Sequence, residues 1–393
     1  MAGSKHTGKG RLSRRRFVKA ALGCAAALAS NAGALAAGEP TPANPNASEN
    51  ARKLLKFLHG LPQRAQKRII SGHLAGGAVG PEVPDKLSGW YRFKLDEIRY
   101  LHEVSGQWVG LIGADYCAGF YDFPNPLHSQ MYYDEMNPAL IEYWNAGGLV
   151  AITTHQFDPR ELYRDGGQCF VKQLPKGTPA LDIARLYTPG CEEYDNFRVI
   201  MDRWAEGLGE LQRHGVVVIW RPFNEVTNSG KWWCRQPAEK FKALFRYTFL
   251  YLTLEKKLNN LLWVYDAVDK SRGHAFNLSH YPGDEFVDIV GVTMNWDSGE
   301  PAQPHHPYPK KVFACVEFNV PAAGRPWNGS ERNYDYMKKF RWVIQHMPYA
   351  TFFMSWDRIA GPYGRGTPES LRQMYNHPWV LNRGEVDWQS AKL

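Results

Sequence analysis

The sequence of 393 residues contains only six cysteines, and no two of them stand in the CxxC spacing that zinc sites and redox proteins use. Beyond residue 36 it has no apolar run long enough to cross a membrane. The glycine-rich segment Ser71–Gly77 lacks the GxGxxG and GKS/T spacings of phosphate-binding turns. We therefore expect no metal, no cofactor and no stable insertion into a membrane.

The positive charge of the chain is concentrated at its beginning. The formal net charge is +8, but residues 1–36 contain seven Lys and Arg and no acidic residue. Subtracting these seven from 47 leaves 40 basic against 39 acidic residues, a balance of +1 for the rest of the chain. Since this balance leaves no basic surface for a polyanion, we expect no nucleic-acid partner.

The basic segment has the organisation of an export signal. Ser13–Lys19 (SRRRFVK) resembles the twin-arginine motif, and an apolar, alanine-rich run follows it over Ala20–Ala29. Ala34–Ala36 provides an A-x-A cleavage site. We predict that residues 1–36 are a signal peptide for twin-arginine export, which would place the mature protein in the periplasm or outside the cell.

Five cysteines lie beyond this segment, an odd number that leaves at least one free thiol. Cys169 and Cys191 flank a loop-like insertion over Arg160–Asp195 and are the candidates for a disulfide. Cys315 lies in an apolar run and is predicted to be a buried free thiol. The sequence does not indicate an oligomer, and we expect a monomer.

After a Pro-, Asn- and Ala-rich leader at residues 37–48, predicted to be flexible, apolar runs alternate with amphipathic helices. Clear helices are expected near 138–144, 196–214, 237–258 and 333–346. Eight strands are predicted at Arg68–Leu74, Trp108–Tyr116, Leu149–Asp158, Val216–Glu225, Leu261–Ala267, Val287–Trp296, Lys311–Val320 and Ala350–Asp357. Near-continuous apolar strands indicate a parallel sheet covered by helices. Eight such units predict an α/β fold, a (β/α)8 barrel in a single domain over residues 49–393, with a doubly wound sheet as the alternative.

Polar residues gather at the C-terminal ends of the predicted strands, the rim that carries the chemistry in barrels. They are Asp115, Tyr116, His155, Asp158, Arg221, Asn224, Glu225, Asp266, Asn295, Trp296, Glu317, Asn319, Trp356 and Asp357. Burial of charged side chains at such positions costs free energy, so these residues are better explained by a function than by packing of the core. A structural ion-pair network with nearby arginines is the alternative.

Two glutamates of this set, Glu225 after the fourth strand and Glu317 in the seventh, suit glycoside cleavage. One carboxyl protonates the leaving oxygen, and the other attacks the anomeric carbon when the two lie about 5 Å apart. Arg221 provides a fixed positive charge that would keep a nearby nucleophile ionised. Aromatic residues make up 13% of the chain, which favours stacking platforms for sugar rings as well as an aromatic core.

Several separate motifs, in order along residues 50–380, resemble glycoside hydrolase family 26, the family best known for β-mannanases. Trp220–Cys234 (WRPFNEVTNSGKWWC) resembles the acid/base strand and aromatic loop of this family, and Glu317–Pro321 (EFNVP) resembles its nucleophile strand. Ile70–His73, Thr154–Pro159 and His280–Val292 resemble further family segments. The resemblance implies a retaining, endo-acting β-mannanase that uses no cofactor.

The resemblance also implies roles for single residues. Glu225 would be the acid/base and Glu317 the nucleophile. The walls of the sugar subsites would include His155, Trp233, Trp296 and Trp356, with Arg221, Asp115 and Tyr116 also in the cleft. Two positions differ from the family pattern: Asn224 replaces a typical His, and Trp296 replaces a frequent Tyr.

Asn224 bears on the substrate because an Asn at this position in related barrel glycosidases binds the 2-hydroxyl of the reacting sugar. The predicted partner is a β-linked polysaccharide, in the first place β-1,4-mannan. A β-1,3-xylanase, a mixed-linkage glucanase and a polysaccharide-binding barrel without turnover are the alternatives.

Overall fold

A computed structural model of the chain describes residues 40–77, 92–118, 133–161, 169–174, 176–227, 230–269, 275–295, 308–320, 332–356 and 360–391. Pro40–Leu393 forms one unit by its internal contacts. The predicted signal peptide, residues 1–36, lies outside the described residues.

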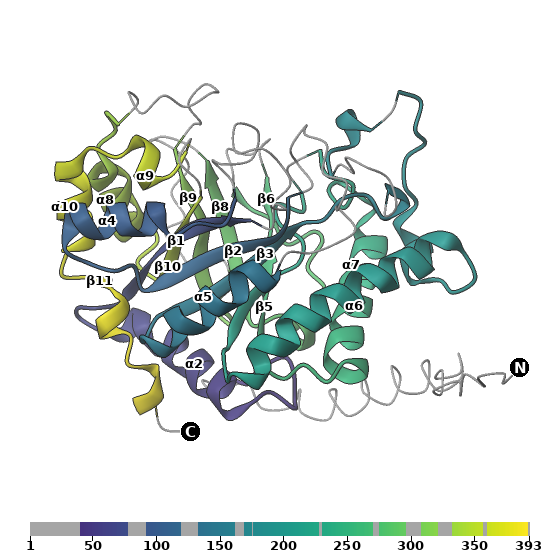
Figure 1. Cartoon of the computed structure of the whole chain (residues 1–393), viewed down its shortest axis with the longest axis horizontal. Helices are drawn as coiled ribbons and strands as arrows, with labels where there is room; N and C mark the ends of the chain where they lie inside the picture. Colours follow the sequence, from purple (N-terminus) through teal and green to yellow (C-terminus); the bar gives the residue numbers. More distant parts are fainter. Residues whose placement is uncertain are drawn as a thin grey trace, which may run out of the picture. The chain divides into compact units, whose positions relative to one another are not determined.

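Eight parallel strands close into a barrel (Figure 1). They are β1 (Ile69–Gly77), β2 (Leu111–Ala118), β3 (Leu149–His155), β4 (Val218–Arg221), β5 (Leu261–Asp266), β8 (Ile289–Asn295), β9 (Val312–Asn319) and β10 (Ala350–Ser355). Parallel pairing of β1 with β10, with Ile70 opposite Phe352, closes the ring. The short β11 (Val380–Leu381) adds a parallel pair to β1. The closed ring confirms the predicted barrel, because a doubly wound sheet would be open.

The composition of the strands explains why the barrel forms. All residues of β5 (LLWVYD) are buried, as expected for a strand that faces side chains inside the barrel and helices outside it. Close packing between neighbouring strands also requires a small residue in β1. A Cβ atom at Gly72 would lie 2.6 Å from the carbonyl oxygen of Phe353 on β10, so only glycine fits.

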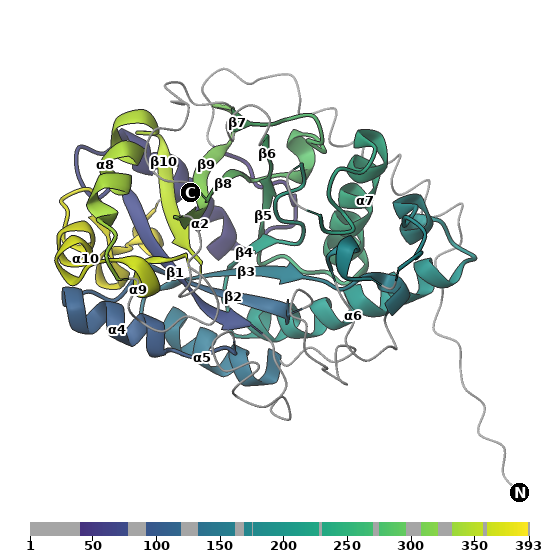
Figure 2. The same cartoon turned by 90° about the horizontal axis from the view of Figure 1, so that it is seen from above.

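Helices surround the strands (Figure 2). They are α2 (Glu49–Gly60), α4 (Asp96–Ser105), α5 (Tyr133–Asn145), α6 (Glu192–Arg213), α7 (Ala238–Leu250), α8 (Tyr336–His346), α9 (Pro362–Arg365) and α10 (Pro368–Tyr375). α7 continues into one π turn, Tyr251–Glu255, and an antiparallel pair joins β6 (Val268–Asp269) to β7 (Ala275–Phe276). Side chains cap helix ends, as when Asp335 accepts from the N–H of Met337. Within the described residues, none of the helices has the length and apolarity needed to span a bilayer.

The leader differs from its prediction as a flexible segment, because residues 40–48 are packed against the rest of the unit. The N–H of Ala43 donates to Asp288 Oδ1 at 2.6 Å, and the side-chain amide of Asn44 donates to the carbonyl of Leu258 at 3.0 Å. Ala43 and Asn44 are buried, and Ser48 caps α2. Buried hydrogen bonds of this kind order a segment whose composition alone suggests flexibility.

The predicted Cys169–Cys191 disulfide is wrong in this structure, where both residues are free thiols. Cys169 is buried, whereas the thiol of Cys191 at the start of α6 donates to the carbonyl of Arg185 at 3.3 Å. Sequence spacing did not show that the two thiols have separate surroundings. The prediction for Cys315 is confirmed: it is a buried free thiol, and burial raises its pKa to about 12.

Candidate active site

Two glutamates at the C-terminal ends of the strands are each ion-paired with a different cation. Glu225 follows β4, and its Oε2 lies 2.8 Å from Nζ of Lys231. Glu317 lies on β9, and its Oε1 is 2.9 Å from Nη2 of Arg221 on β4. Both glutamates are buried, at 9% and 5% exposure. The structure thus brings Arg221 to Glu317, as expected, and adds Lys231, which the sequence analysis did not select.

Asp266 at the end of β5 connects the two sides of the site. Its Oδ2 accepts from Nη1 of Arg221 at 2.8 Å and from the backbone N–H of Glu225 at 3.0 Å. The hydroxyl of Thr293 on β8 also donates to this carboxylate. Asp266 is fully buried, and burial raises its pKa while the Arg221 charge lowers it. This residue therefore holds the guanidinium of Arg221 and the backbone of Glu225 in place.

The backbone at Glu225 is in the left-handed region, with φ of 50°. Such a conformation is uncommon for a residue with a side chain and persists only where its surroundings hold it. Here Asp266 binds the N–H of Glu225, and the thiol of Cys234 donates to its carbonyl oxygen at 3.2 Å. The turn after β4 thereby directs the carboxyl of Glu225 to Lys231.

The charges of this cluster do not balance when every group is ionised. Three carboxylates, Asp266, Glu225 and Glu317, face two cations, Arg221 and Lys231. Burial raises the pKa of Glu317 to about 7; Arg221 opposes the rise and Glu225 adds to it. Because Glu225 and Glu317 interact, their protonation is a property of the pair, and the raised pKa favours a form in which one of the two carries a proton.

A second chain of hydrogen bonds links β2, β3 and the turn after β4. Nδ1 of His155 lies 2.5 Å from Oδ2 of Asp115, and its Nε2 lies 3.0 Å from the side-chain amide nitrogen of Asn224. A proton on Nδ1 that donates to Asp115 leaves Nε2 to accept from Asn224. Burial lowers the pKa of His155, which keeps the ring neutral, although Asp115 opposes this effect. Asp115 thus orients His155 and lies behind it, not on the cleft surface.

The orientation of Asn224 leaves an acceptor unused. Asn224 is 1% exposed, and its Oδ1 has no hydrogen-bond partner within the part of the chain that the structure describes. A buried acceptor without a partner is costly, so a ligand that donates a hydroxyl would be stabilised here.

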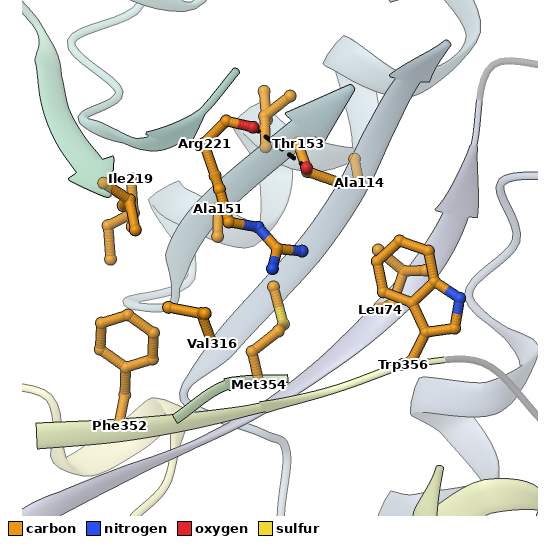
Figure 3. Close-up of a pocket in the computed structure, with 12 residues that line it drawn as sticks. Leu74, Ala114, Ala151, Thr153, Ile219, Arg221, Val316, Phe352, Met354 and Trp356 are labelled. Carbon is orange, nitrogen blue, oxygen red and sulfur yellow. Dashed lines mark hydrogen bonds between the residues drawn. The ribbon is translucent and has the colours of Figure 1, made fainter. Parts of the chain in front are cut away.

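Trp356, which follows β10 directly, lies beside Asn319 and His155. Its backbone N–H donates to Asn319 Oδ1 at 2.7 Å, and its ring lies edge-on to His155 with centroids 5.3 Å apart. Trp356 also lines a cavity that runs into the barrel, with the guanidinium of Arg221 pointing into it (Figure 3). The other lining residues are mostly apolar: Leu74, Ala114, Ala151, Ile152, Thr153, Ile219, Val264, Val316, Phe352 and Met354.

Besides Asp115, two further residues expected in the cleft lie elsewhere. Tyr116 is fully buried, and its hydroxyl donates at 2.8 Å to Asn137 on α5. Since neighbouring residues of a strand point to opposite sides, Asp115 faces the barrel mouth and Tyr116 the helices. Trp233 is also fully buried; its indole N–H donates to the carbonyl of Asn224 at 2.9 Å, so it supports the turn from behind. Trp296 lies outside the described residues.

Comparison with known proteins gives a consistent set of matches. A model of "Glycosyl hydrolase family 26" matches residues 43–385. The mannan endo-1,4-beta-mannosidase A and B of Caldalkalibacillus mannanilyticus is 29% identical over 358 residues, which cover 88% of this chain and 63% of that protein. A mannan endo-1,4-beta-mannosidase of Bacillus subtilis is 26% identical and covers 90% of this chain and 91% of its own length. The structure of a Bacillus subtilis mannanase, 24% identical with a TM-score of 0.71, covers 89% of this chain and 97% of its own and shows the shared fold.

Proposed function

Because the chain belongs to glycosyl hydrolase family 26, we propose that it is a retaining endo-β-1,4-mannanase with Glu225 as acid/base and Glu317 as nucleophile. The observation that carries the proposal is the pair of buried glutamates at the barrel mouth, each with its own cation. A carbohydrate-binding barrel without turnover has no need for such a pair. The activity printed for the relatives supports mannan as the substrate.

The proposed reaction has two steps. Glu317 attacks the anomeric carbon while Glu225 gives its proton to the glycosidic oxygen, so that the glycosidic C–O bond breaks and a glycosyl ester of Glu317 forms. Glu225, now ionised, then takes a proton from water, and the resulting attack on the anomeric carbon releases Glu317. Arg221 stabilises the carboxylate form of Glu317 before the first step and after the second.

Two groups at the barrel mouth are suited to contact the substrate: an acceptor atom of Asn224 and the ring of Trp356. The Oδ1 atom of Asn224 is a buried acceptor, so we propose that it takes a hydrogen bond from a hydroxyl of the reacting sugar. Trp356 presents an aromatic face beside His155 on which a pyranose ring would stack. We propose that these two residues and His155 position the sugar over the glutamates.

The test is release of reducing sugar by residues 37–393 on glucomannan, galactomannan, β-1,3-xylan and mixed-linkage glucan, with Glu317→Ala as the inactive control. We expect release from the two mannans. Release from the xylan or the glucan alone would overturn the substrate assignment and indicate that Asn224 switches specificity. A folded protein that is silent on all four polymers would favour the binding barrel.

We further propose that the protein is exported by the twin-arginine route to the periplasm or beyond. The support is the SRRRFVK motif, the apolar run behind it and the A-x-A site. Fractionation of cells that express the full chain is the test, with Arg14 and Arg15 replaced together by Lys. Retention of this variant in the cytoplasm is expected, and unchanged export would count against the route.

A further inference from the structure

Lys231 is a buried cation beside the proposed acid/base residue. Its side chain is 2% exposed, and its Nζ lies 2.8 Å from Oε2 of Glu225. The rings of Phe170 and Trp233 lie 5.9 Å and 5.7 Å from this ammonium group. Lysine is seldom buried unless it is paired, because removal of an ammonium from water is costly. The contact with Glu225 is therefore the main compensation for its burial.

The insertion after β3 holds Lys231 in this position. Phe170 pairs with Lys231 in an antiparallel bridge. On either side of the bridge, the N–H of Val171 donates to the carbonyl of Gly230 at 2.9 Å, and the N–H of Trp232 donates to the carbonyl of Cys169 at 3.0 Å. These backbone bonds fix the loop from both sides, so the ammonium is directed to Glu225 before any substrate arrives.

The charged surroundings of Glu225 come from several elements. Lys231 makes the direct ion pair, Asp266 of β5 binds the backbone N–H of Glu225, and the thiol of Cys234 donates to its carbonyl oxygen. Arg221 of β4 and Glu317 of β9 add one charge of each sign nearby. Lys231 itself stays protonated: burial lowers its pKa, but Glu225 and the other neighbours more than offset this, so that its pKa is raised.

We propose that Lys231 is a positioning residue whose positive charge favours the ionised form of Glu225. With this charge in place, the enzyme is active at a lower pH than it would be without Lys231. The inference rests on the proposed function. In the first step the O–H bond of Glu225 breaks as the glycosidic oxygen takes the proton, and Lys231 stabilises the carboxylate that forms. In the second step the same charge keeps Glu225 ionised as the base until water gives it a proton.

Removal of this charge has a defined sign. An opposite charge in contact lowers the pKa of a carboxyl by about 1–3. Without the ammonium group, Glu225 keeps its proton to higher pH, which moves the alkaline limb of activity upward. The base form in the glycosyl-enzyme also appears only at higher pH, which moves the acidic limb upward. We therefore expect both limbs of the profile to move in the same direction.

The experiment compares pH profiles of mannan hydrolysis for the wild type, Lys231→Met and Lys231→Arg, with folding checked by thermal unfolding. Lys231→Met should shift both limbs to higher pH by about one to three units, and Lys231→Arg should leave the limbs at the wild-type pH. Lys339→Met is the matched control, because this second lysine is also 2% exposed and donates to the carbonyl of Met294. An unshifted profile in Lys231→Met, or an equal shift in Lys339→Met, overturns the proposal.

A double variant separates this proposal from the proposed function. On an activated aryl β-mannoside, Lys231→Met should shift the profile less in a Glu225→Ala background than in the wild type, because its main effect passes through Glu225 and only its weaker effect on Glu317 remains. An equal shift in that background overturns the role of Lys231 and leaves the acid/base assignment intact. Full activity of Glu225→Ala on mannan would instead overturn the proposed function itself.

Discussion

The two glutamates stand on different kinds of backbone. Glu317 lies within β9, where its neighbour across the sheet is Thr293 on β8, so its position follows from strand pairing in the barrel, with a shift of register just before this pair. Glu225 lies four residues beyond the end of β4, with a left-handed backbone held by Asp266 and Cys234. The group proposed to form a covalent bond is thus on the rigid frame, and the group proposed to move protons is on a turn whose contacts can tune it.

The largest effect is expected from replacing Glu317, the glutamate on the barrel strand. Glu317→Ala should lower kcat on mannan by at least about 10^4-fold, because no other group can form the glycosyl ester. The check is the initial rate of reducing-sugar release together with the thermal unfolding curve. Near-wild-type turnover in a folded Glu317→Ala protein would contradict the nucleophile assignment.

Glu225→Ala removes the glutamate on the turn after β4, and the loss of activity should depend on the leaving group of the substrate. General acid catalysis contributes about 10^2–10^4-fold, so hydrolysis of mannan should fall by that factor. An aryl glycoside with an activated leaving group needs no protonation in the first step and should lose far less rate in that step. Pre-steady-state measurement of aryl release separates the two, and equal losses on both substrates would speak against an acid/base role.

Asp266→Asn tests both glutamates together, because Asp266 binds the backbone N–H of Glu225 and also Arg221, the partner of Glu317. The negative charge of Asp266 raises the pKa of Glu317, so its removal should lower that pKa and move the acidic limb of the profile to lower pH, because Glu317 must be ionised to attack. We also expect a loss of about 100-fold in kcat, because a small misplacement of the reactive groups can cost this much. The pH dependence of kcat/KM measures the shift, and a limb that moves upward would refute the charge argument.

Trp356→Ala should have the smallest effect, mainly on binding. Loss of one stacking surface is expected to raise KM about tenfold with a smaller change in kcat. Trp233→Phe is the matched control, because Trp233 is fully buried and its indole N–H supports Asn224. If Trp233→Phe raised KM as much as Trp356→Ala, Trp356 could not be distinguished as the residue on which the sugar stacks.

Strand direction explains which rim residues could be predicted. The apolar runs indicate where each strand lies, and all eight predicted strands are present in the barrel. The side to which a rim residue points depends on its place in the alternation along the strand. That is why Asp115 lies inside at the mouth, whereas Tyr116 next to it contacts Asn137 on a helix.

The sequence alone determined the barrel, the rim position of the two glutamates and the pairing of Arg221 with the seventh strand, because period and strand order dictate which ends meet. Only the tertiary structure showed Lys231 beside Glu225, the Asp115–His155–Asn224 chain and the free thiols of Cys169 and Cys191. These features depend on long-range burial. Phe170 pairs with Lys231, which is more than fifty residues away in the sequence. No local sequence pattern shows that this contact will bury the charge of Lys231.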